Sequence, residues 1–207
     1  MNYLKFIKIT LLVLCVTVVA LLIVKNFYRQ DCDSLKIKNR KEKNEKPVIK
    51  NVNASDLAPE IMNSGQWINT EKEITFADLK GKVVVIEFWT FGCYNCVNTL
   101  PYLKKWYDKY KSDDFEMIGI HCPEFDNERD FENVKENTQR LGIKYPVLTD
   151  NEFSVWKEYD VHAWPTIFII DRKGEIRYKK VGEGKYDEME QKINELLNEN
   201  FTNEIKN

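Results

Sequence analysis

Hydrophobic positions beyond residue 60 change between strand-like runs and helix-like repeats. Val83 to Thr90 is an almost continuous apolar run, which predicts a central strand buried on both faces. From Val97 to Tyr110 the apolar residues recur every three or four positions, as on one face of a helix. We expect further strands at 66–69, 73–76, 115–120, 146–148, 167–170 and 176–181, and further helices at 129–141, 152–159 and 186–200.

This order of elements indicates an α/β fold. The strands at 167–170 and 176–181 are separated by the turn residues Arg172 to Glu175, so they predict a β-hairpin. A last amphipathic helix follows, with Met189 and Ile193 on its apolar face. Strands that alternate with helices and end in such a hairpin predict a mixed central sheet flanked by helices on both faces.

A separate apolar segment stands near the start of the chain. Ile9 to Val24 is a run of sixteen residues without charge, Gly or Pro, and counted from Leu4 the stretch reaches 21 residues. That length is enough to cross a bilayer as a helix. A cleaved signal peptide is the alternative, but no small-residue cleavage site follows the run. We therefore expect residues 1–25 to be a retained signal anchor.

Charge divides the rest of the chain into two regions. Residues 25–50 carry nine basic and four acidic residues, a net of +5, whereas residues 51–207 carry 20 basic and 29 acidic residues, a net of −9. We expect residues 26–55 to be a disordered polar stalk and residues 56–203 to be the folded domain. An acidic domain lacks the basic face that nucleic-acid binding requires, so we expect no nucleic-acid partner.

The candidate chemistry is a pair of cysteines, Cys93 and Cys96, placed between the central strand and the helix that follows it. At a helix N-terminus, free backbone N–H groups and the helix dipole favour a thiolate. The same spacing could form half of a structural zinc site, which needs two further ligands. No second pair of this kind is present, so we favour a redox role and predict no metal site. The remaining cysteines and the histidines are Cys15, Cys32, Cys122, His121 and His162.

The sequence around this pair resembles the thioredoxin superfamily. The resemblance rests on Phe88 to Cys96 and on Trp164-Pro165-Thr166 before a later strand. More narrowly, it looks like the membrane-anchored TlpA/ResA-like branch. The stretches 98–103 and 121–125 are similar to the thioredoxin-like domain attached to DipZ-type transporters. The resemblance covers about residues 60–200 and implies a thioredoxin-like fold.

The resemblance also implies roles for individual residues. Cys93 would be the exposed nucleophile and Cys96 the buried resolving thiol, so a redox-active Cys93–Cys96 disulfide would replace any cofactor. Pro165 would be cis and would present backbone to the substrate. Glu87 would be a buried carboxyl that accepts the proton of Cys96. Two tryptophans are expected to pack around the dithiol, either as core residues or in contact with substrate: Trp89 and Trp164.

The histidines and the remaining cysteines have other expected roles. We expect His121 and His162 to be structural. We expect Cys122 to be an inert thiol, with a third redox partner or a metal contact as alternatives. Cys32 could form an intermolecular disulfide. Tyr94 and Asn95, between the two cysteines, differ from the common spacers of the superfamily, so they leave the direction of electron flow open.

Together these features predict a membrane-anchored thiol–disulfide oxidoreductase. Its domain would lie outside the cytoplasm and act, more as a reductant than as an oxidant, on protein disulfides or on the cysteines of apocytochromes. Cysteine-containing proteins would be its substrates, and a membrane thiol-electron transporter of the CcdA/DipZ type would supply electrons. Two alternatives stay open. Cys93 could reduce peroxides, with Cys96 or Cys122 resolving its sulfenic acid, or the two cysteines and a histidine could bind and deliver a metal ion.

Overall fold

The structure is a computed structural model and describes residues 57–61 and 65–199. The predicted anchor at 1–25 and stalk at 26–55 lie outside these residues, as do the outer ends of the predicted domain at 56–203. None of the helices in the described ranges has the length and apolar character needed to cross a bilayer.

The described residues form a mixed sheet of six strands in the order β1-β4-β3-β2-β5-β6. The central strand β2 pairs in parallel with β3 and antiparallel with β5, which confirms the predicted mixed sheet. The strands are β1 (Trp67–Ile68), β2 (Val83–Trp89), β3 (Phe115–His121), β4 (Val147–Thr149), β5 (Thr166–Ile170) and β6 (Ile176–Val181). The helices are α2 (Phe76–Leu79), α3 (Tyr94–Tyr110), the 3-10 turn η1 (Asp126–Glu128), α4 (Phe131–Arg140), α5 (Ser154–Glu158) and α6 (Tyr186–Asn198).

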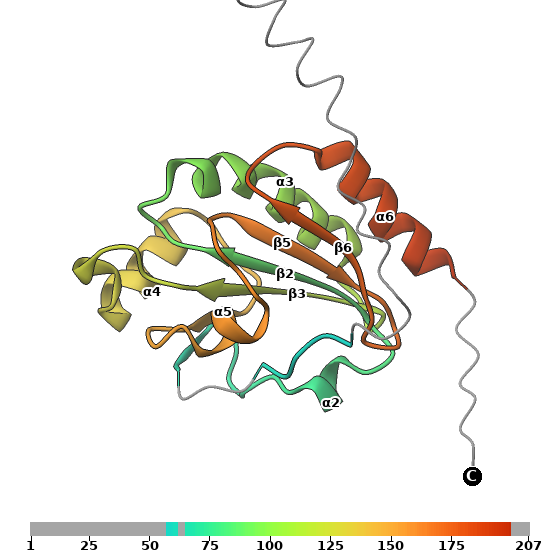
Figure 1. The fold of residues 1–207 in the computed structure, drawn as a ribbon, viewed down its shortest axis with the longest axis horizontal. Coiled ribbons are helices and arrows are strands. Elements are labelled where there is room, and N and C mark those ends of the chain that lie inside the picture. The colour runs from blue at the N-terminus through green and yellow to red at the C-terminus, as the bar shows by residue number, and fades with distance from the viewer. Residues whose placement is uncertain (1–56, 62–64, 200–207) are drawn as a thin grey trace, which may run out of the picture. The chain divides into compact units, whose positions relative to one another are not determined.

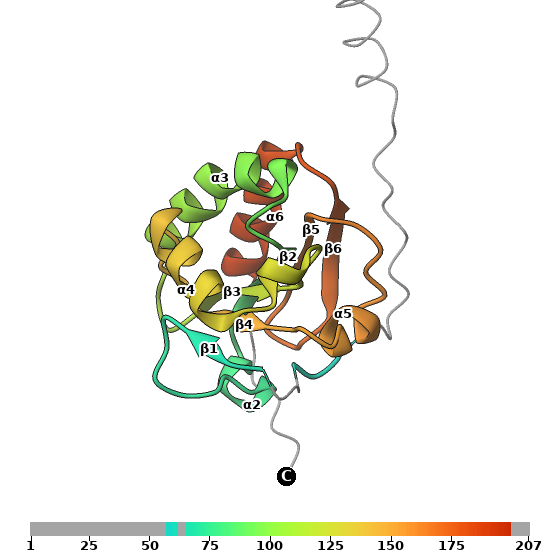
Figure 2. The same ribbon diagram turned by 90° about the vertical axis from the view of Figure 1, so that its left-hand side faces the viewer.

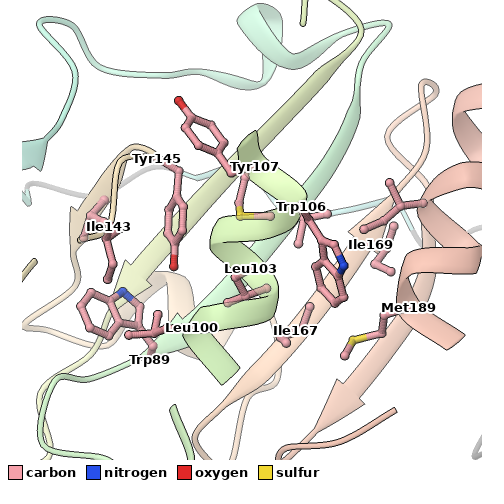
Figure 3. Packing of buried hydrophobic residues seen from close by; sticks show 14 of the residues in the cluster. Trp89, Leu100, Leu103, Trp106, Tyr107, Ile143, Tyr145, Ile167, Ile169 and Met189 are labelled. Carbon is pink, nitrogen blue, oxygen red and sulfur yellow. The ribbon is translucent and has the colours of Figure 1, made fainter. Parts of the chain in front are cut away.

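Helices cover both faces of this sheet, as predicted. Figures 1 and 2 show α3 and α6 on one side and α2 and α5 on the other. Since successive side chains of a strand point to opposite faces, β2 contributes to both sides, and every residue of β2 is buried. One face packs against a cluster that includes Val85, Trp89 and Cys96, here named the α3-side core. Figure 3 shows part of this core, with Trp89 labelled. The other face packs against the α5-side core, which includes Phe88 and Cys122.

Most predicted elements are present, but one is wrong. The strand expected at 73–76 is not formed, and the chain instead turns into the short helix α2. The side chain of Asp78 accepts hydrogen bonds from the N–H of Thr75 at 3.0 Å and from its hydroxyl at 2.7 Å. These local bonds favour the start of a helix over a strand, because they satisfy backbone donors that strand pairing would otherwise use.

Candidate active site

The end of β2 places Cys93 at the first turn of α3. Cys93 is the N-cap of this helix, and its sulfur accepts a hydrogen bond from the N–H of Cys96 at 3.2 Å. The carbonyl of Cys93 accepts from the N–H of Val97 at 3.1 Å, which begins the helical ladder. The sulfur of Cys93 therefore lies at the N-terminal end of the helix and accepts one of the backbone N–H groups that have no partner within the helix.

The two sulfurs of the pair differ in exposure, as the sequence predicts. Cys93 is half-buried, whereas the side chain of Cys96 is fully buried in the α3-side core, and both are free thiols. Burial raises the pKa of the Cys96 thiol far above its usual range, and the nearby charge of Glu87 raises it further. Cys96 thus needs a proton acceptor before it can attack, while Cys93 is accessible to a partner.

Glu87 lies in the middle of β2 and is fully buried, which confirms the predicted burial of this carboxyl. Its Oε2 accepts a hydrogen bond from the hydroxyl of Tyr145 at 3.0 Å, and its Oε1 has no partner among the described residues. Burial raises the pKa of Glu87 to about 8, against the opposing effect of the Tyr145 hydrogen bond. A carboxyl with such a pKa exchanges its proton near neutral pH, so it can serve Cys96 as an acceptor.

Tyr145 is a site residue that the sequence analysis missed. Its ring and the indole of Trp89 both pack over Gly119 of β3, the residue that pairs with Glu87 in the sheet. A Cβ at Gly119 would lie 2.9 Å from the Trp89 Nε1 and 3.1 Å from the Tyr145 ring, so a side chain there would displace both. Trp89 has no exposed surface, so the structure favours core packing over the predicted contact with substrate.

The Trp164–Pro165 peptide bond is cis, which confirms this part of the prediction. Thr166, the next residue, pairs with Phe88 of β2, so Pro165 lies level with the end of β2 from which the dithiol loop starts. The carbonyl of Pro165 accepts a hydrogen bond from the N–H of Gly182 at 2.7 Å. Trp164 is half-buried and donates from its Nε1 to the carbonyl of Cys122 at 3.1 Å. Contact of Pro165 and Trp164 with a substrate stays a prediction.

His121 is buried at the end of β3, close to the dithiol loop. Its ring stacks on Phe91, with 5.5 Å between centroids, and its Nε2 lies 3.3 Å from the hydroxyl of Thr90. Burial lowers the pKa of His121 to about 4, so the ring is neutral at neutral pH. This environment agrees with the expected structural role. His162 is exposed, 2.9 Å from the carboxylate of Asp160.

Cys122 is a fully buried thiol in the α5-side core, the cluster that does not contain Cys96. Its sulfur lies 3.7 Å from an oxygen of Asp150, and burial raises the pKa of the thiol well above its usual range. An inert thiol agrees with this environment. Across residues 57–61 and 65–199, no group of three or more His, Cys, Asp or Glu side chains is arranged to hold a metal ion.

A second residue missed by the sequence analysis is Glu128 of η1, a fully buried carboxylate. One of its oxygens accepts a hydrogen bond from the N–H of Gly92, the residue before Cys93, at 2.9 Å. Its position in a charged stretch gave no sign of this burial, because acidic residues in such stretches are usually solvated. Only the fold brings it to the dithiol loop.

Comparison with known proteins assigns this arrangement to a family. The profile of the family described as "AhpC/TSA family" matches residues 54–179, which include both cysteines, Glu87 and Pro165. The chain belongs to the AhpC/TSA family. Within it, the domain is thioredoxin-like and homologous to thiol–disulfide oxidoreductases.

Three relatives illustrate this homology. Protein DipZ of Mycobacterium tuberculosis is 38% identical over 144 residues, which are 69% of this chain and 21% of DipZ. The thiol-disulfide oxidoreductase ResA of Bacillus thuringiensis is 34% identical over 119 residues, 58% of this chain and 66% of ResA. A crystal structure of a thiol-disulfide isomerase from Corynebacterium glutamicum superposes with a TM-score of 0.62 and 31% identity, covering 69% of this chain and 98% of that one. The chain spans about a fifth of the length of the DipZ proteins.

Proposed function

We propose that this protein is a membrane-anchored thiol–disulfide oxidoreductase that reduces protein disulfides outside the cytoplasm. One observation carries the proposal: Cys93 is accessible at a helix N-terminus, while Cys96 is buried close to a carboxyl with a raised pKa. Disulfide exchange requires this inequality, since one sulfur must meet the substrate and the other must wait for the mixed disulfide.

The reaction follows from this geometry. The thiolate of Cys93 attacks one sulfur of a substrate disulfide, so that a mixed disulfide forms and the other substrate sulfur leaves as a thiolate. Cys96 then gives its proton to the Glu87 carboxylate and attacks the sulfur of Cys93. The Cys93–Cys96 disulfide closes, the second substrate sulfur leaves, and two electrons have passed to the substrate. The cycle is completed when an outside donor reduces the new disulfide.

The location and the partners of the protein belong to the same proposal. The apolar run at 9–24 supports a membrane anchor, and disulfides are formed and managed mainly outside the cytoplasm. A reductant there needs electrons from across the membrane, so we propose a membrane thiol transporter of the CcdA/DipZ type as its donor. Apocytochrome cysteines are the proposed substrate class, because the resemblance to the TlpA/ResA-like branch implies them.

Two of the alternatives find less support: peroxide reduction resolved by Cys122, and metal delivery. Peroxide reduction with Cys122 as the resolving thiol is disfavoured, because Cys122 is buried in the α5-side core, opposite the cluster that holds Cys96. Metal delivery by the pair and a histidine is disfavoured because His121 is buried with Thr90 and aromatic rings, and His162 is paired with Asp160.

A trapping experiment tests the proposal. Cys96→Ala removes the resolving thiol, so Cys93 should stay covalently linked to its partner, and mass spectrometry after acid quenching should identify a cysteine-containing protein. The matched control is Cys93→Ala/Cys96→Ala, which should capture none. If alkylation of the wild-type protein in cells never detects the Cys93–Cys96 disulfide, the proposed exchange is wrong.

A further inference from the structure

Glu128 joins the dithiol loop to the turn that follows β3. Its Oε1 accepts a hydrogen bond from the N–H of Gly92 at 2.9 Å, and its Oε2 accepts from the N–H of Phe125 at 3.0 Å and from that of Glu124. All three donors are backbone amides, and the side chain has no exposed surface. The backbone directly before Cys93 is therefore fixed by one buried carboxylate.

Glycine at position 92 makes this contact possible. A Cβ at Gly92 would lie 2.3 Å from the Oε1 of Glu128, which is closer than real Cβ atoms come to any heavy atom. Gly92 is not among the glycines with positive φ, so its backbone conformation is open to any residue. The requirement for glycine thus comes from the approach of Glu128 and not from the local turn.

The hydrogen bonds also define the charge of this group. Three N–H donors suit the ionised carboxylate, which only accepts hydrogen bonds, whereas a protonated carboxyl would need an acceptor of its own. Among the described residues, no Lys or Arg forms an ion pair with Glu128. The neighbouring His121 is neutral at neutral pH because of its burial. The other titratable groups near the pair are Glu87 on β2 and Tyr145 before β4.

We propose that Glu128 is a positioning residue that makes the Cys93–Cys96 pair a stronger reductant. The inference rests on the proposed function. Reducing a substrate disulfide takes two electrons and two protons from the dithiol, and the product disulfide carries no charge. A fixed negative charge one peptide from Cys93 opposes its thiolate but does not affect the neutral disulfide. The charge of Glu128 therefore favours the disulfide over the dithiol and lowers the reduction potential of the pair. This effect favours electron flow from the pair to the substrate, a direction that Tyr94 and Asn95 leave open.

The test compares Glu128→Gln with Glu124→Gln. Both variants remove one negative charge from the same turn, but Glu124 is exposed to solvent. The rate of Cys93 alkylation is measured against pH in a Cys96→Ala background, and the equilibrium with glutathione is measured with both cysteines present. In Glu128→Gln we expect the alkylation midpoint to fall by about half to one pH unit, since a nearby like charge shifts a pKa by about that amount. We expect the glutathione equilibrium at pH 8.5 to move several-fold toward the dithiol, up to about tenfold, or about 30 mV.

In Glu124→Gln the alkylation midpoint should move by less than about 0.3 pH units, and the glutathione equilibrium constant should change by less than about twofold, because solvent screens an exposed charge. The inference is overturned if a folded Glu128→Gln protein behaves as the wild type, or if Glu124→Gln shifts it equally. If Glu128→Gln does not fold, Gly92→Ala replaces it. This variant keeps the charge but pushes the carboxylate away from the loop, so a smaller fall of the midpoint is expected, and no fall contradicts the inference. A wild-type pair that forms no reversible disulfide with glutathione would contradict the proposed function instead.

Discussion

The sheet carries a buried thiol near a buried carboxylate on each of its faces. In the α3-side core, Cys96 lies within the electrostatic influence of Glu87. In the α5-side core, the sulfur of Cys122 lies 3.7 Å from Asp150. Burial raises the pKa of both thiols well above the usual range. The two pairs resemble each other in composition, yet only the first has the arrangement that thiol chemistry needs.

The carboxylates differ in the number of donors that they accept. Asp150 accepts from the N–H and the hydroxyl of Ser154 at 2.8 and 2.9 Å and from the N–H of Trp156 at 2.9 Å, so it holds the first turn of α5. Glu87 accepts one hydrogen bond, from Tyr145, and its second oxygen has no partner among the described residues. Both oxygens of Asp150 are thus occupied by donors, whereas Glu87 has a free oxygen that can take up a proton without the loss of a hydrogen bond.

The thiols differ in their neighbours along the chain. Cys96 lies one helical turn after Cys93, whose sulfur accepts its N–H at 3.2 Å. Cys122 has no cysteine at this spacing. Its N–H donates to the carbonyl of Trp89 at the end of β2, and its carbonyl accepts from the indole of Trp164. A buried thiol near a carboxylate is therefore not enough for exchange chemistry. It also needs a carboxylate with a vacant acceptor site and an accessible sulfur within reach.

The largest effect that this comparison predicts is on exchange activity. Cys93→Ala should reduce the rate of disulfide reduction by at least about 10³-fold, because the attacking nucleophile is lost. Cys122→Ala should keep the rate within about twofold while costing about 1 kcal/mol of stability through the small cavity it leaves. An insulin-reduction assay with dithiothreitol as donor measures the rate of disulfide reduction in both variants. A Cys122→Ala protein that is folded but inactive would remove the distinction between the two thiols.

The next effect concerns the pH dependence of stability. The pKa of Glu87 is about 8 in the fold and 4.5 in the unfolded chain, so between these values the folded state keeps a proton that the unfolded chain has released. The free energy of unfolding contributed by Glu87 should therefore fall as pH rises through this window. The total is a few kcal/mol, at about 1.4 kcal/mol per pKa unit.

Denaturant unfolding of the reduced protein at pH 5, 6.5 and 8 measures this slope. Glu87→Gln should remove the contribution of this carboxyl to the slope. His121, with a pKa of about 4 in the fold, contributes a slope of opposite sign below pH 6.5 in both proteins. The slope of Glu87→Gln is therefore subtracted from that of the wild type, which leaves the effect of Glu87 alone. Equal slopes in wild type and Glu87→Gln would show that the carboxyl is not held protonated by burial.

Glu87→Gln should also slow the resolving step by about 10- to 100-fold at pH 7, because the acceptor for the Cys96 proton is lost. Asp150→Asn is the control on the opposite face. It alters the hydrogen bonds of α5 but should leave the resolving rate of the folded protein within about threefold. The decay of a preformed mixed disulfide at Cys93, followed by rapid quenching and mass spectrometry, measures this step directly. Equal slowing by both variants would indicate a general effect of stability.

Long periodic elements of the fold could be predicted from the sequence, and short ones could not. β2 and α6 are long enough for their patterns to be distinctive, and both were predicted within two residues. The stretch at 73–76 is too short for such a pattern, and the hydrogen bonds between Thr75 and Asp78 decide its structure. A local contact of this kind outweighs a four-residue alternation.

The site divides in a similar way. Cys93, Cys96, Glu87 and Pro165 belong to local motifs or to an unusual position in an apolar strand, so the sequence pointed to them. Tyr145 lies 58 residues from Glu87, and Glu128 lies 36 residues from Gly92, so their contacts depend on how distant segments pack. The periodic pattern of hydrophobic residues gives no information about such contacts between distant segments. In the sequence, the buried Glu128 looks the same as the solvent-exposed acidic residues around it.

The smallest predicted effect tests whether the number of donors separates the two carboxylates. In the wild type, the hydrogen bond from Tyr145 lowers the pKa of Glu87. Tyr145→Phe removes this bond, so the pKa of Glu87 should rise by about half to one unit. The pH midpoint of the resolving step should move upward by the same amount. Ser154→Ala removes the hydroxyl donor of Asp150 but leaves its backbone donors, so this midpoint should stay within about 0.2 units of wild type. An unchanged midpoint in a folded Tyr145→Phe protein would mean that Glu87 owes its behaviour to burial alone, and that the contrast with Asp150 lies elsewhere.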